Sequence, residues 1–197
     1  MPCKVAYFCK VPTRLDRIGF PRPLSRNLKH LRFKTLEKAL ATLPVQKAIL
    51  DGEIVCIDAN GVSQFNELLS RKVEPVLYAF DLLWLNGEDL RRLPLMVRKD
   101  RLAALVRSAD CDRIMYAQHV EGEGKRLFAE ICRRDLEGVA AKRKMGIYKD
   151  DGSAWFKIKN RKYSQAEGRH ELLTRRRAQS KLWSPAHPMR RFCAADA

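Results

Sequence analysis

Two spacings of hydrophobic residues recur along this chain, and together they predict a mixture of helices and strands. Apolar positions three and four residues apart predict amphipathic helices, whereas alternating or short continuous apolar runs predict strands. The helical spacing marks residues 33–43, 94–106 and 125–133, and a shorter stretch at 64–71. The strand patterns mark residues 48–57, 76–85, 114–120, 136–144 and 155–159.

Two Asn-Gly pairs indicate how the strands connect. Asn60-Gly61 follows the first strand pattern, and Asn86-Gly87 follows the second. Asn-Gly is typical of tight hairpin turns, because both residues tolerate positive φ. The sequence therefore predicts an α+β fold with mainly antiparallel sheets and flanking helices.

Neither end of the chain shows a sustained periodicity of hydrophobic residues. Pro12, Pro21 and Pro23 interrupt any helix near the start, and no clean alternation replaces it. Residues 1–24 are therefore predicted to be an irregular, basic N-terminal segment. Residues 174–197 contain an arginine triplet and two prolines without a repeat, and they are predicted to be a basic, disordered tail.

Length and charge narrow the class of protein. The 197 residues, 46% of them hydrophobic, can bury a real core in one domain or two small ones. The formal net charge is +16, and it is concentrated at the ends: residues 1–38 carry +8, 161–191 carry +7, and 39–160 only +2. Such a distribution favours a polyanionic partner, with nucleic acid first, although solvated tails would give the same count.

The chain shows no signal for a membrane or for secretion. No run of 18 apolar residues occurs, and residues 1–10 lack a long apolar stretch. The six cysteines are scattered, with no Cys-x-x-Cys pair and no Cys-His cluster at zinc spacing. We therefore expect a cytoplasmic protein with reduced thiols and no membrane partner.

Three of the predicted strands carry charged residues in patterns that suggest a site. Asp51 and Glu53 share one face of their strand, since side chains alternate with period two, and so do Lys157 and Lys159 on the last strand. Two ammonium groups on one face attract a phosphate, and Glu137 precedes a run of small residues on a third strand. Each pattern alone is also typical of a solvated face. Together they suit a nucleotide phosphate with Mg²⁺.

Four short runs, in this order, make the family recognisable. They are LDGE at 50–53, YAFDLL at 78–83, LEGVAAKR at 136–143 and WFKIKN at 155–160. They resemble four successive nucleotidyltransferase motifs of ATP-dependent DNA ligases, especially the bacterial end-joining type. The likeness spans about residues 25–173, and it implies a partial, ATP-grasp-like adenylation domain with ATP and Mg²⁺ as cofactors.

The resemblance also implies a role for individual residues. An aromatic side chain stacks on adenine, carboxylates contact the ribose and hold Mg²⁺, and lysines neutralise the α-phosphate. By motif position these are Phe80 for adenine, Glu53 for the ribose and the metal, Glu137 for the metal, and Lys157 and Lys159 for the α-phosphate. Ser25-Arg26-Asn27 is similar to a short family element that would place Arg26 near the nucleotide or the nicked strand.

One family element has no counterpart at the expected position. Family members form a lysine–AMP adduct on a K-x-D-G motif well before the D-G-E strand, and the single literal match here is Lys149-Asp150-Asp151-Gly152, far downstream. We interpret that match as a polar turn. About 26 residues follow Glu171, too few for the OB-fold domain with which these ligases usually continue. The sequence thus suggests a truncated catalytic domain without its nucleophilic lysine.

Two readings of the function follow. The first is an ATP-dependent DNA ligase that seals nicks through adenylated intermediates in repair and recombination. The second is a non-catalytic DNA- or nucleotide-binding pseudo-ligase module. RNA ligases and capping guanylyltransferases share the scheme, but the motif wording favours DNA ligase. By resemblance we expect nicked or broken duplex DNA as partner, an end-joining protein as a possible second one, a monomer, and association with the nucleoid.

Overall fold

The computed structural model describes residues 11–16, 22–23, 31, 33–58, 67–68, 73–109, 111–149 and 155–164. The chain divides into a unit of residues 1–162 and a second unit of residues 163–197. All the helices and strands described below belong to the first unit. The boundary thus falls about ten residues before the predicted end of the folded domain at 173.

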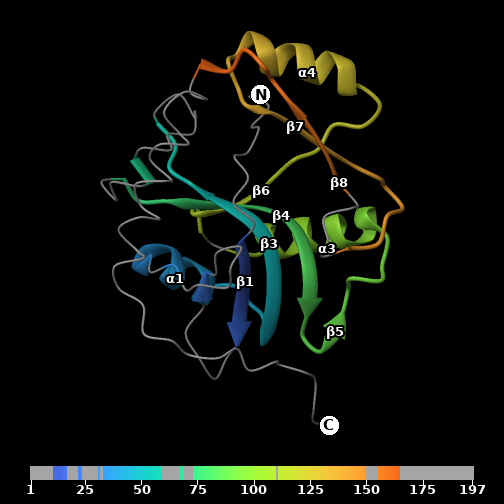
Figure 1. Cartoon of the computed structure of the whole chain (residues 1–197). Coiled ribbons are helices and arrows are strands. Elements are labelled where there is room, and N and C mark those ends of the chain that lie inside the picture. The colour runs from blue at the N-terminus through green and yellow to red at the C-terminus, as the bar shows by residue number, and fades with distance from the viewer. Residues whose placement is uncertain are drawn as a thin grey trace, which may run out of the picture. The chain divides into compact units, whose positions relative to one another are not determined.

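The larger sheet has six strands and is mostly antiparallel. Its order is β2 (Arg22–Pro23), β1 (Val11–Asp16), β3 (Lys47–Val55), β4 (Val76–Leu85) and β5 (Glu88–Asp89), with β6 (Ile114–Tyr116) also pairing with β4. Only the β4–β6 pair is parallel. Figure 1 shows β1, β3 and β4 side by side. The predicted class, α+β with mainly antiparallel sheets, is confirmed.

The prediction that residues 1–24 are irregular is wrong, because β1 and β2 lie within them. β1 pairs along six residues with β3, from Val11 opposite Gly52 to Asp16 opposite Lys47. Strand β1 forms through main-chain hydrogen bonds to β3, and these do not require polar and apolar side chains to alternate along β1. Among the described residues, β2 pairs with Thr13 and Arg14 and not with Pro12, and a proline is tolerated where a strand has no partner on one side.

Two helices cover one face of the large sheet. In α1 (Lys34–Ala41) the apolar residues at three- and four-residue spacing are buried, as the sequence predicted for 33–43. The second helix, α3 (Leu95–Arg107), begins after Pro94 as expected. One core cluster joins them to the strands; it includes Leu36, Leu40, Leu50, Leu77, Leu82 and Leu102, all at most 1% exposed. Each such leucine stabilises the fold by about 2 kcal/mol.

A second, two-stranded sheet carries the C-terminal motifs. β7 (Gly138–Lys142) and β8 (Trp155–Lys159) are antiparallel, with Gly138 opposite Lys159 and Lys142 opposite Trp155. Helix α4 (Gly124–Arg133) packs beside β7 (Figure 1). The predicted strand at 136–144 is thus real but shorter, and the predicted strand at 114–120 corresponds to the three residues of β6.

The described Asn-Gly turn forms as predicted. Asn86 and Gly87 have φ values of 46° and 101° and connect β4 to β5. The Asn86 side chain also accepts a hydrogen bond from the Gln46 amide at 2.8 Å. Asn60-Gly61 lies outside the described residues, and of the predicted helix 64–71 only residues 67–68 are described, both helical. No helix in the described part of the chain is long and apolar enough to cross a membrane.

Gly138 is expected to be essential for the two-stranded sheet. Its φ is +153°, and a Cβ there would lie 2.2 Å from the Ile158 carbonyl oxygen. Gly138→Ala is therefore expected to lower the free energy of unfolding by about 2 kcal/mol or more in urea titrations. Gly124→Ala is the control, because a Cβ there meets nothing within 4 Å, and its effect should stay below about 1 kcal/mol. Equal effects of the two substitutions would contradict this account.

Candidate functional site

Strand β4 contains an irregularity at the residue expected to contact the base. Asp51 pairs with Asp81, but the next residue, Gly52, pairs with Ala79, so Phe80 is left as the extra residue of a bulge. A bulge of this kind turns a side chain out of the regular alternation and bends the strand. Phe80 is consequently half-buried within a strand whose neighbours are buried.

The bulge places the carboxylates on one face of the sheet. Asp51 and Glu53 alternate with the core residues of β3, and their cross-strand partners are Asp81 and Tyr78. These four side chains therefore lie on the face opposite the helices. Asp51, Glu53 and Asp81 are 1%, 2% and 1% exposed, which excludes the alternative that the β3 carboxylates line a solvated face.

Asp81 is the centre of a buried ion cluster. Arg98 of α3 donates to its two carboxylate oxygens, from Nε at 2.7 Å and from Nη2 at 3.0 Å, and the Leu82 amide donates at 3.0 Å. The Lys142 ammonium of β7 lies 3.6 Å from the Asp81 Oδ2 atom. Burying a carboxylate is costly unless cations and donors satisfy it, and here two cations from different elements do so.

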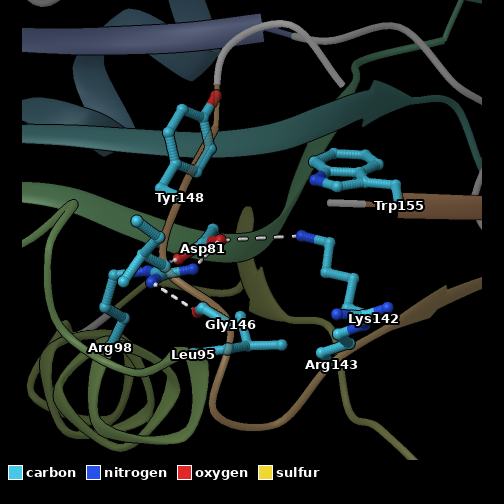
Figure 2. Close-up of a pocket in the computed structure, with 9 residues that line it drawn as sticks. Asp81, Leu95, Arg98, Lys142, Arg143, Gly146, Tyr148 and Trp155 are labelled. Carbon is cyan, nitrogen blue, oxygen red and sulfur yellow. Dashed lines mark hydrogen bonds and ion pairs between the residues drawn. The ribbon is translucent and has the colours of Figure 1, made fainter. Parts of the chain in front are cut away.

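Lys142 also lies against two aromatic rings. Its Nζ atom is 4.5 Å from the centroid of Phe80 and 3.8 Å from that of Trp155, and the two rings meet edge to face at 5.4 Å. Figure 2 shows the Lys142 side chain reaching toward Asp81 beside Trp155. Burial lowers the pKa of Lys142, and the carboxylates of Asp81 and Asp51 act in the opposite direction.

A loop residue links the same region to β3. The Tyr148 hydroxyl donates to Asp51 Oδ2 at 3.1 Å, and the Tyr148 amide donates to the Arg91 carbonyl at 2.8 Å. Asp81, Arg98, Tyr148 and Trp155 are among the residues around a small pocket of about 10 Å³ (Figure 2). That volume holds roughly one water molecule.

The predicted phosphate-binding lysines share a face with Lys142. On β8, residues 155, 157 and 159 alternate with the exposed Phe156 and Ile158, and cross-strand pairing aligns them with residues 142, 140 and 138 of β7. At about 3.3 Å per residue, Lys157 lies about 7 Å and Lys159 about 13 Å along the strand from Trp155. Both are exposed.

Glu137 lies at the end of the two-stranded sheet away from Lys142. It directly precedes β7, and its carbonyl accepts a hydrogen bond from the Asn160 amide at 2.7 Å. The Asn160 side chain donates to the Leu136 carbonyl at 3.0 Å, which fixes the chain at this point. The structure therefore brings the main chain at Glu137 next to the end of the strand that carries Lys157 and Lys159.

Some predicted features do not enter this arrangement. Arg26 lies outside the described residues, as do residues 150–152 of the interrupted K-x-D-G match. Within the described ranges, no three His, Cys, Asp or Glu side chains gather as a metal site, and the predicted metal residues Glu53 and Glu137 come from separate sheets.

Sequence reasoning assigned no role to Asp81, Arg98, Lys142 or Tyr148. A signal existed for Asp81, since a carboxylate inside the apolar run 76–85 must find a cation. The same signal existed for Lys142 at the end of an apolar strand. Nothing in the local pattern shows that these two residues, 61 positions apart, are partners.

Lys99 is a further buried cation close to the bulge. Its Nζ donates to the Ala117 carbonyl at 3.1 Å and lies 4.7 Å from the centroid of the Tyr116 ring. Burial, followed by repulsion from Lys142, lowers the pKa of Lys99 to about 8, although Asp81 acts in the opposite direction.

The fold, with buried carboxylates and Phe80 on one sheet and Lys142 of a second sheet in contact with them, is that of a nucleotidyltransferase domain. Residues 20–159 match the family described as ATP dependent DNA ligase domain. The chain belongs to this family. Its motifs and relatives identify it as part of an adenylation domain of the bacterial end-joining type.

Individual relatives agree with this assignment. The chain is 38% identical over 149 residues to the multifunctional non-homologous end joining protein LigD of Pseudomonas aeruginosa, covering 72% of this chain and 18% of that protein. It is 31% identical over 165 residues to a DNA ligase of Sulfophobococcus zilligii, covering 73% of this chain and 27% of the relative. The chain therefore spans well under half the length of these relatives.

Solved structures show the same fold. The ligase domain of M. tuberculosis LigD superposes with a TM-score of 0.67 at 25% identity, covering 78% of this chain and 51% of that one. A mycobacterial DNA ligase D complexed with ATP and MES gives a TM-score of 0.67 at 26% identity, with 77% and 51% covered. The predicted fold family is confirmed over the matched part.

The buried Lys99 gives a pH dependence that can be measured. Between about pH 8 and 10.5 the folded chain has released the Lys99 proton while the unfolded chain still binds it. The free energy of unfolding should therefore rise through this interval, by up to about 3 kcal/mol. Lys99→Met has a side chain of similar length that binds no proton, so urea titrations across this interval should show a smaller rise, the remainder coming from Lys142, whose pKa burial also lowers. Parallel pH profiles for the two proteins would contradict this prediction.

Proposed function

We propose that this chain binds ATP between its two sheets as the nucleotide-binding part of an ATP-dependent DNA ligase. The observation that supports this most is the contact of the lysine-bearing face of β7–β8 with Phe80 and Asp81, through Trp155 and Lys142. This contact supports the proposal because it brings the strand that carries Lys157 and Lys159 to the sheet that carries Phe80 and Glu53.

Each predicted residue has a chemical part in this proposal. Phe80 stacks on adenine, since a bulged aromatic at a sheet face offers a flat apolar surface. Glu53 accepts hydrogen bonds from the ribose hydroxyls. Lys157 and Lys159 neutralise the α-phosphate, where negative charge accumulates during transfer.

The carboxylates suit Mg²⁺ as the accompanying cation. Mg²⁺ is usually held by one or two carboxylates, with phosphate oxygens and water completing the shell, so a cluster of three side chains is not required. Glu53 and Glu137 would supply the two carboxylates. An ion held by these carboxylates would neutralise charge on the bound phosphates.

The proposed biological reaction is the sealing of nicked or broken duplex DNA during repair and recombination. In the family's scheme a lysine attacks the α-phosphate of ATP and pyrophosphate leaves, AMP passes from that lysine to a 5′-phosphate at the nick, and the 3′-hydroxyl then displaces AMP. The excess of positive charge at both ends of the sequence supports DNA as the partner. Association with an end-joining protein, a monomeric state and a place at the nucleoid belong to the same proposal.

The phosphate-binding role of the β8 lysines can be separated from base binding. Lys157→Ala and Lys159→Ala are each expected to weaken ATP binding about tenfold or more, since each removes a charge-assisted contact. Adenosine, which lacks the phosphates, should bind almost as before. Lys125→Ala on α4 is the matched control, because Lys125 is exposed on another element. Isothermal titration of both ligands provides the comparison, and equal losses for ATP and adenosine would contradict the assignment.

The covalent step separates the enzyme from the pseudo-ligase alternative. No K-x-D-G motif precedes the D-G-E strand in this sequence, and this favours binding without adduct formation by this chain. Incubation with α-labelled ATP and Mg²⁺, followed by a denaturing gel, is expected to give no labelled band. A labelled band would show that another lysine replaces the missing nucleophile.

A further inference from the structure

The two-stranded sheet depends on its contacts with the rest of the chain. A pair of strands alone is at best marginally stable in water, and β7 and β8 have only five residues each. One face offers little burial, because Phe156 and Ile158 are 57% and 44% exposed. The position of this sheet is therefore set largely by α4 and by the contacts of the opposite face.

On that opposite face, contacts to the large sheet come from Trp155, from Tyr148 in the loop after β7, and from the ion pair of Lys142. The Lys142 side chain is 16% exposed and its Nζ atom is buried between Phe80, Trp155 and Asp81. Asp81 is already paired with Arg98 at 2.7 Å, and this ion pair joins β4 to α3. The second cation comes from a different sheet, so its pairing with Asp81 also joins β7 to β4.

We propose that Lys142 and Asp81 are positioning residues, a latch that holds the lysine-bearing face of β7–β8 against the sheet that carries Phe80 and Glu53. The latch lies at the end of β7 where Trp155 meets Phe80, so it fixes the starting point from which Lys157 and Lys159 extend along β8. The role of the latch in positioning residues for ATP binding rests on the proposed function, whereas its role in docking the two sheets does not.

Hydrogen exchange measures the docking without any nucleotide. In Lys142→Ala, amides of residues 138–142 and 155–159 are expected to exchange at least tenfold faster, while those of β3 and β4 stay protected. Lys142→Arg keeps the cation and should restore slow exchange. Lys144→Ala is the matched control, because Lys144 lies two residues away and forms an exposed ion pair with Glu121. Unchanged exchange in Lys142→Ala would overturn the latch.

Ligand binding then tests the positioning role. Lys142→Ala is expected to reduce the preference for ATP over adenosine at least fivefold, and Lys142→Arg should recover it. If exchange accelerates but this preference is unchanged, the latch docks the sheet and the positioning role is overturned. If the unaltered chain shows no preference for ATP, the proposed function fails, and the exchange experiment still decides the docking role.

A second variant tests the Asp81–Lys142 pair by changing Asp81 instead of Lys142. Asp81→Asn removes the carboxylate that both Arg98 and Lys142 share, so faster exchange is expected in β7–β8 and also in α3. Asp89→Asn is its control, because Asp89 forms a similarly short but exposed ion pair with Arg91. Exchange that accelerates in α3 alone would contradict the link to β7.

Discussion

The carboxylate of Asp81, buried within an apolar strand, is the constraint on which the site depends. A buried charge of this kind is tolerated only when donors and cations converge on it, and in this chain they come from α3, from β7 and from the next main-chain amide. Such clusters contribute little net stability compared with apolar packing. Their effect is geometric, because only one arrangement of the three elements satisfies the charge.

The bulge at Phe80 brings an aromatic ring to the same face of the sheet as this carboxylate. In a regular strand Phe80 and Asp81 would point to opposite faces, and one of them would enter the leucine core under α1 and α3. The extra residue shifts the alternation, so Asp81 faces its cross-strand partner Asp51 while Phe80 reaches Trp155. One face of the sheet thus packs helices, and the other carries charge and aromatic surface.

The sequence predicted the elements whose signal is local. Helices α1, α3 and α4 and strands β3, β4 and β8 were predicted because the spacing of apolar residues within each of them is typical of that element. β1 escaped prediction because its hydrogen bonds depend on an edge of β3 some forty residues away. Alternation pointed to Asp51, Glu53, Lys157 and Lys159, and the roles expected of the site residues come from the resemblance. The Asp81–Lys142 pair was not predicted, since partner choice is a property of tertiary packing.

Binding and covalent chemistry are separable in such a site. Stacking on an aromatic ring, pairing of phosphates with lysines and acceptance of hydrogen bonds by carboxylates need only fixed charges and a fixed distance between the sheets. A nucleophilic lysine adds a bond but is not required for that geometry. Because Lys142 of the proposed latch and the two lysines proposed to bind phosphate lie on the same small sheet, the docking of that sheet against Asp81 would decide whether the proposed nucleotide site is assembled.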